Sequence, residues 1–224
     1  MLQERRDLVA TSYLGVGLYS IPEAGRIVGA PISRVRRWLD PESGVVERCL
    51  NPAERTITFV ELMDLFFIRM FRDEGVSLQT IRKVSEAAAK KFRAAHPFAV
   101  KRFDTDGKTV FATLKSDPDE QELVEDLAKS QYVFDNILRP FFRKLEYDRY
   151  AIRYWPLERD GRVVLDPERH FGKPIDAESG IPTKTIHEAV TAGGGQECAA
   201  VAQWLGISID AVNAAVEFER SLSS

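Results

Sequence analysis

Cysteine and histidine are scarce in this sequence, which has two cysteines, Cys49 and Cys198, and three histidines among 224 residues. Two cysteines this far apart exclude a disulfide framework and a four-cysteine zinc site. The histidines show no metal-ligand spacing, and the glycine triplet at 193–195 is not followed by the Gly-Lys-Ser/Thr of a phosphate-binding loop. We therefore predict that the protein is not an enzyme and uses no metal and no cofactor.

Long apolar runs are also missing from the chain. Every stretch of about 18 residues contains charged side chains, which excludes a membrane-spanning helix. The first residues, MLQERRD, do not form the apolar core of a secretory signal. The expected localisation is cytoplasmic, with no membrane partner.

An overall excess of positive charge, as expected for a nucleic-acid-binding protein, is absent because the net charge is −3. The charges are distributed unevenly, however. Residues 1–95 carry 15 Lys and Arg against 12 Asp and Glu, whereas residues 166–224 carry 4 against 9. A basic first part and an acidic last part indicate different partners for the two ends of the chain.

The basic part contains the pattern of a helix-turn-helix. Ser20 and Glu23 have the spacing of a helix-capping box, and Gly29 and Pro31 end the helix that begins there. A second short helix is predicted over residues 32–39, and it carries several arginines. Two short helices joined by a glycine-containing turn are typical of proteins that place the second helix in the major groove of DNA.

The second helix would bury its apolar residues against the first and expose its polar ones. The exposed residues are Ser33, Arg34, Arg36 and Arg37. An arginine side chain can donate two hydrogen bonds to guanine or to a phosphate, so we predict that these residues contact DNA. The alternative is that they form only the solvated face of an amphipathic helix.

A β-hairpin is predicted directly after this helix. Two β-prone runs, residues 44–50 and 56–59, flank an Asn-Pro loop. In this position a hairpin would act as a wing, with Arg48 and Arg55 as phosphate contacts. Cys49, in the first run, is predicted to be a small buried residue and not a reactive thiol.

Helices are expected next over residues 59–73 and from 78 to about 92. The first is apolar on almost all sides, which favours either an interdomain or dimer interface or an ordinary core helix. The segments YSIPE (19–23), WL (38–39), FIR (67–69) and GVSLQTIR (75–82) resemble the DNA-binding head of MerR-type regulators. The resemblance covers about residues 15–90 and implies a winged helix-turn-helix.

The middle of the chain is predicted to be an α/β connector. An Asp-Gly turn between residues 98–103 and 109–114 favours a hairpin, and a helix is expected to begin near residue 116. Apolar residues continue at helical spacing from 133 to 145, and residues 147–155 alternate like a strand with one buried face.

The acidic C-terminal part is predicted to form a strand, two turns and three helices, the last two over about 197–205 and 209–220. The last helix exposes Asp210, Asn213, Glu217 and Glu219, opposed only by Arg220. An acidic face loses the main source of affinity for DNA, so a protein partner or self-association is expected here.

The segments DP (166–167), FGKP (171–174) and GIPT (180–183) resemble a small bacterial domain of antitoxins of the VapB type. That resemblance covers about residues 155–220 and implies a partner toxin nuclease of the PIN-like class. Together with the basic DNA-binding head, it leads us to predict an antitoxin that represses its own gene by binding double-stranded operator DNA as a homodimer. The alternatives are a stand-alone MerR-like regulator, whose C-terminal domain senses a ligand or oligomerises, and an adaptor that contacts only proteins.

The whole chain is thus predicted to be mainly α with small β-hairpins. Residues 1–95 are expected to form the winged helix-turn-helix DNA-binding domain. Residues 96–153 form the connector, a candidate dimerisation region. Residues 154–224 form a small antitoxin-like domain of three helices with a short β segment.

Overall fold

The computed structural model describes residues 15–51, 54–115, 126, 131–158, 161–192 and 198–222. The chain divides into a larger unit, Ser20–Ala151, and a smaller unit made of Met1–Tyr19 and Ile152–Ser224. Residues 96–151, assigned to a connector by sequence, therefore belong to the same compact unit as the helix-turn-helix segment.

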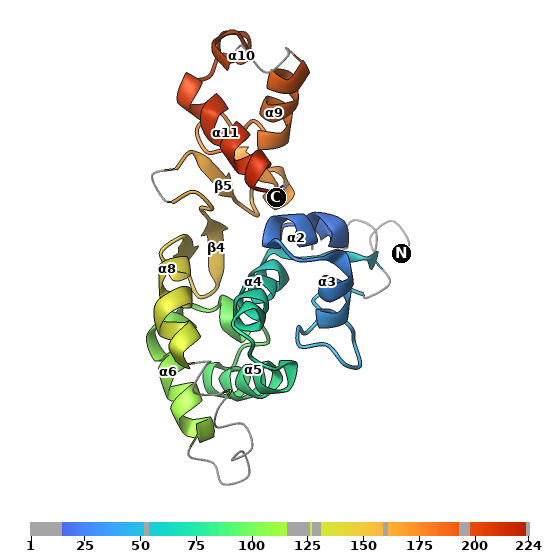
Figure 1. Ribbon diagram of the computed structural model, residues 1–224, viewed down its shortest axis with the longest axis vertical. Helices are drawn as coiled ribbons and strands as arrows, with labels where there is room; N and C mark the ends of the chain where they lie inside the picture. Colours follow the sequence, from blue (N-terminus) through green and yellow to red (C-terminus); the bar gives the residue numbers. More distant parts are fainter. Residues whose placement is uncertain are drawn as a thin grey trace, which may run out of the picture. The chain divides into compact units, whose positions relative to one another are not determined.

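The larger unit is mainly helical (Figure 1). Its elements in chain order are α2 (Ile21–Val28), α3 (Ile32–Trp38), β2 (Thr56–Ile57), α4 (Phe59–Asp73), α5 (Leu78–Phe92), η2 (Pro97–Ala99), α6 (Lys101–Lys115), η4 (Phe134–Leu138), α8 (Arg139–Phe142) and β3 (Leu145–Tyr147). The predicted helices at 21–28, 32–39, 59–73 and 78–92 are confirmed. Their caps are local, since the side chains of Ser20, Thr58 and Ser77 accept hydrogen bonds from the first turns of α2, α4 and α5.

A cluster of phenylalanine rings forms the core of this unit. Phe67 of α4 is fully buried, and its ring contacts Phe98, Phe103, Phe141 and Phe142 at centroid distances of 5.4 to 6.0 Å. All four of these ring pairs are tilted or edge-to-face and none is a parallel sandwich, the arrangement that aromatic quadrupoles disfavour. The apolar surface of α4 is therefore covered from within the unit, as expected for the core-helix alternative.

The predicted hairpin over residues 98–114 is wrong, because residues 101–115 form the single helix α6. The Asp-Gly pair that predicted a turn lies inside this helix. Gly107 is buried, and a Cβ atom at this position would lie 2.5 Å from Cε2 of Phe134. The glycine is thus required for close packing of η4 on α6, and not for a turn. The helix start predicted near residue 116 lies outside the described residues.

The smaller unit contains three antiparallel strands followed by three helices. The strands β4 (Ala151–Tyr154), β5 (Val163–Leu165) and β6 (Pro174–Asp176) are neighbours in chain order, and Val164 of β5 lies opposite Ile175 of β6. The helices are α9 (Thr183–Ala192), α10 (Cys198–Leu205) and α11 (Ile209–Ser221), which Figure 1 shows as one cluster. These elements confirm the predicted C-terminal helices.

One acidic residue of α11 is not where the sequence placed it. Glu219 was expected on the exposed face, but it is 4% exposed, and Oγ1 of Thr183 donates to its carboxylate at 2.5 Å. Asp210, Asn213 and Glu217 are exposed as predicted. The acidic face is therefore smaller than the sequence suggested.

The turns of the smaller unit depend on buried carboxylates. Asp176 accepts hydrogen bonds from the amide and hydroxyl of Ser179, both at 2.7 Å, and from Nε of Arg162 at 3.1 Å. Burial opposes the charge of Asp176, but these bonds outweigh it and lower its pKa. Asp176 thus has a structural role in the turn before the GIPT segment (180–183).

Within the described part of the chain, no single helix is long and apolar enough to cross a membrane. Helices α10 and α11 meet the length and composition criteria only together, with a bend of 114° between them.

We predict that Gly107→Ala destabilises the larger unit, although alanine has the higher helix propensity. The new methyl group would overlap the Phe134 ring, and overpacking of this kind costs about 1–3 kcal/mol. Urea unfolding measures the change. Thr105→Ala, at an exposed position of the same helix, is the control and should change stability by less than about 0.5 kcal/mol. A Gly107→Ala variant more stable than the parent would contradict the packing described here.

Candidate nucleic-acid interface

Helices α2 and α3 pack closely because the turn between them contains small residues. Gly29 ends α2 in the left-handed conformation, with φ of 74°, and its amide donates to carbonyl groups of the last turn. Gly25 is buried, and a Cβ atom there would lie 2.9 Å from the carbonyl oxygen of Ala30. Val35 and Trp38 of α3 are 0% and 2% exposed. The predicted helix pair is therefore formed, with the apolar side of α3 buried.

The opposite side of α3 carries the residues that the sequence assigned to DNA. Ser33, Arg34, Arg36 and Arg37 are all exposed. Successive residues of a helix are rotated by about 100°, which aligns Ser33 with Arg37 at the centre of this face. By the same rotation, Arg34 and Arg36 lie at its two edges.

The arginines of this face keep their charge available. Among the described residues, no carboxylate forms an ion pair with Arg34, Arg36 or Arg37. Asp40, just beyond the helix, is bound elsewhere: its Oδ1 accepts from the amide of Ser43 at 2.8 Å, from the Ser43 hydroxyl and from the amide of Glu42. The bonds from Ser43 lower the pKa of Asp40, so this carboxylate remains an anion that stabilises its own loop.

The predicted wing is not present as a hairpin between residues 44–50 and 56–59. Residues 44–50 form an irregular loop with bends, and β2 pairs with β1 (Tyr19–Ser20) instead. The loop after α3 folds back on its own helix, since the amides of Val45 and Val46 both donate to the carbonyl of Trp38, at 2.9 and 3.2 Å. The first β-prone run therefore bonds to the helix end and has no strand partner.

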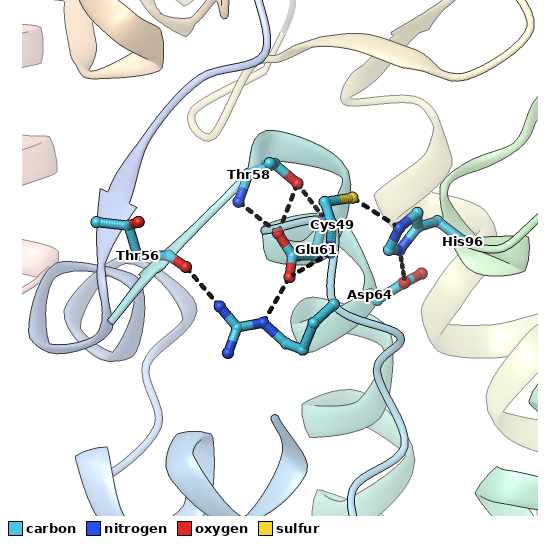
Figure 2. Close-up of polar contacts among 7 residues, drawn as sticks. Cys49, Thr56, Thr58, Glu61, Asp64 and His96 are labelled. Carbon is cyan, nitrogen blue, oxygen red and sulfur yellow. Dashed lines mark hydrogen bonds and ion pairs between the residues drawn. The ribbon is translucent and has the colours of Figure 1, made fainter. Parts of the chain in front are cut away.

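Arg48, predicted as a phosphate contact, is turned inward. Its side chain is 8% exposed, its Nε donates to Oε1 of Glu61 at 2.8 Å, and its Nη2 donates to the carbonyl of Thr56 at 2.6 Å. Glu61 is fully buried and also accepts from the amide and hydroxyl of Thr58, which form the capping box of α4 (Figure 2). The sequence alone shows Arg48 as a cation in a β-prone run. It does not show that Glu61, 13 residues later, is buried and forms an ion pair with Arg48.

Arg55, the second predicted wing residue, is exposed and has a positive φ of 50°. Its carbonyl oxygen accepts from the amide of Ile21 at 3.4 Å, which connects the residue before β2 to the start of α2. Arg55 thus lies beside the helix pair with its side chain in solvent.

A second polar group beside Arg48 was not predicted from the sequence. Sγ of Cys49 lies 2.9 Å from Nε2 of His96, and Nδ1 of His96 lies 2.8 Å from Oδ2 of Asp64 (Figure 2). Cys49 is exposed, which corrects the prediction of a buried residue, whereas His96 and Asp64 are buried. No local pattern joins positions 49, 64 and 96, so only the fold brings them together.

Among the described residues, no group of three or more His, Cys, Asp and Glu side chains has the arrangement needed to hold a metal ion.

No family model matches the chain. The chain is 26% identical over 227 residues to a Mycobacterium tuberculosis protein named "Putative antitoxin VapB45", which covers 90% of this chain and 93% of that protein. The crystal structure of Rv2018 from Mycobacterium tuberculosis is similar, with a TM-score of 0.74, 22% identity, and coverage of 91% of this chain and 99% of that one. The first similarity extends over almost the whole length of both chains, and that relative is named as an antitoxin. The second shows a shared fold.

We predict that Arg48→Met destabilises the larger unit by about 3–5 kcal/mol, because it leaves the buried Glu61 carboxylate without its cation. Denaturant unfolding measures the change. Arg55→Met removes an exposed arginine from the same region and should cost less than about 0.5 kcal/mol. Equal stabilities of the two variants would contradict the internal role of Arg48.

Proposed function

We propose that this protein is a DNA-binding antitoxin that represses its own operator through α3. The observation that carries this proposal is the exposed arginine face of α3, which has no ion pair within the described part of the chain. Unpaired cations on one face of a rigid helix fit the phosphate-lined major groove. The similarity to a protein named as an antitoxin supports the regulatory setting.

In this proposal, we give each exposed residue of α3 a DNA contact that follows from its position on the helix. Arg37, at the centre of the exposed face, points toward base edges, and Ser33 lies one turn before it. Arg34 and Arg36, at the edges, point toward the two phosphate backbones. Arg55 adds a phosphate contact beside the helix pair. A homodimer would place two such helices on half-sites about 34–36 Å apart, or a multiple of that distance.

We propose further that the smaller unit binds a toxin nuclease of the PIN-like class. Helices α9 and α10 line an apolar hollow of about 550 Å³, and Trp204 at its edge is 75% exposed. Exposed tryptophans next to apolar hollows are frequent centres of protein interfaces. The exposed acids of α11 complement the basic, RNA-binding surface of a nuclease.

The first prediction from this proposal concerns the arginines of α3. Arg37→Ala should weaken binding to the operator upstream of the gene by about 5- to 150-fold and reduce discrimination against other DNA. Arg34→Ala and Arg36→Ala should weaken binding to all sequences alike and each reduce the salt slope of log K by about 0.9. Fluorescence anisotropy titrations at several salt concentrations measure both effects.

Lys90→Ala is the matched control for these titrations, because it removes one exposed cation from α5 of the same unit. It should leave the operator affinity and the salt slope unchanged. Loss of binding in Lys90→Ala but not in the α3 variants would contradict the assignment of α3. Absence of binding by the parent protein at low salt would favour an adaptor that contacts only proteins.

The second prediction concerns the toxin. The protein should co-purify with the nuclease encoded by the adjacent gene, and Trp204→Ala should weaken that complex by at least about 2 kcal/mol. Tyr132→Ala removes an exposed aromatic side chain from the larger unit, is the matched control and should bind normally. Operator binding without any nuclease partner would contradict the antitoxin proposal and favour a stand-alone regulator.

A further inference from the structure

The Cys49, His96 and Asp64 side chains, here called the thiol triad, lie on three separate segments of the larger unit. Cys49 lies in the loop between α3 and α4, Asp64 is on α4, and His96 precedes η2. The side chains of His96 and Asp64 are only 7% and 4% exposed, whereas Cys49 reaches solvent. The triad thus joins a solvent-accessible sulfur to a buried imidazole that a buried carboxylate orients.

The charged groups around the thiol triad determine whether the His96 imidazole is protonated. Burial alone would lower the pKa of His96, but the hydrogen bonds and charges of Asp64 and Cys49 outweigh burial and raise it to about 11. Burial raises the pKa of Asp64. The other charged groups nearby are Glu61 of α4 and Arg48, and they pair with each other. His96 is therefore an imidazolium that donates to Asp64 and to the sulfur.

We propose that Cys49 is an oxidation site at which hydrogen peroxide converts the sulfur beside His96 to a sulfenic acid. A neighbouring imidazolium favours the thiolate, the form of cysteine that acts as a nucleophile. The sulfur attacks one peroxide oxygen, an S–O bond forms and the O–O bond breaks. The leaving hydroxide takes the proton from Nε2 of His96 and becomes water. Sulfur is thus oxidised by two electrons and peroxide is reduced.

The surroundings of Cys49 favour this reaction over acyl transfer. An acyl-transfer site needs donors for a developing oxyanion, often including a backbone amide beside the nucleophile. Here the amide of Cys49 donates to Oε1 of Glu61 at 3.3 Å, so a carboxylate occupies that place. A negative charge there opposes an oxyanion, whereas peroxide is neutral when it reaches the sulfur.

The test treats the full-length protein with a fixed excess of hydrogen peroxide and traps sulfenic acid with dimedone at timed intervals. Mass spectrometry of the peptides then gives a separate rate for each cysteine. Cys198, half-buried in the smaller unit, is the control within the same molecule. We expect Cys49 to react at least about tenfold faster than Cys198.

Two variants separate activation by His96 from simple exposure of Cys49. His96→Gln keeps a hydrogen-bonding side chain but cannot become a cation, so the Cys49 rate should fall about tenfold. Asp64→Asn keeps the imidazole but removes the charge that holds its proton, and should also slow the reaction. Circular dichroism establishes that each variant is folded. An unchanged Cys49 rate in a folded variant overturns the proposal.

The parent protein offers a test that needs no variant. At one pH, the Cys49 rate in the parent should exceed the Cys198 rate by at least about tenfold, because an imidazole nitrogen lies 2.9 Å from the Cys49 sulfur. Equal rates at Cys49 and Cys198 would show an ordinary thiol and overturn the proposal.

Discussion

The buried carboxylate of Glu61 is the interaction on which the rest of the larger unit depends. Its two oxygens accept from the amide and hydroxyl of Thr58, from Nε of Arg48 and from the amide of Cys49. A charge with no exposed surface must be fully hydrogen-bonded, so each of these groups is held in one place. Glu61 thereby holds together the start of α4, the end of the strand before it and the loop after α3.

The helices were predictable because their signals are local. Ser20, Gly29 and Ser77 stand at helix ends that propensity and capping rules identify, and the periodicity of α11 gave its length. The exposed face of α3 followed from the same periodicity. Gly107 shows where this reasoning fails: an Asp-Gly pair is typical of a turn, but contact with Phe134 decided the conformation.

The long-range part of the site was beyond sequence reasoning. Arg48 and the arginines of α3 are close in sequence and alike in chemistry, yet one is paired with a buried acid and the others face solvent. Nothing near Arg48 identifies Glu61 as its partner, because the pairing depends on how the loop returns to α4. The contacts among Cys49, Asp64 and His96 depend on the same return of the loop to α4, and the sulfur lies in solvent where the sequence had predicted burial.

The loop between α3 and α4 connects the two proposed roles, DNA binding through α3 and oxidation of Cys49. Sγ of Cys49 lies only 2.9 Å from Nε2 of His96, so an oxygen added on that side has no room unless the loop moves. The loop is joined to α3 through the Trp38 carbonyl and to α4 through Glu61. A chemical change at Cys49 would therefore act on a loop that is hydrogen-bonded to α3, the helix through which we propose that the protein binds DNA.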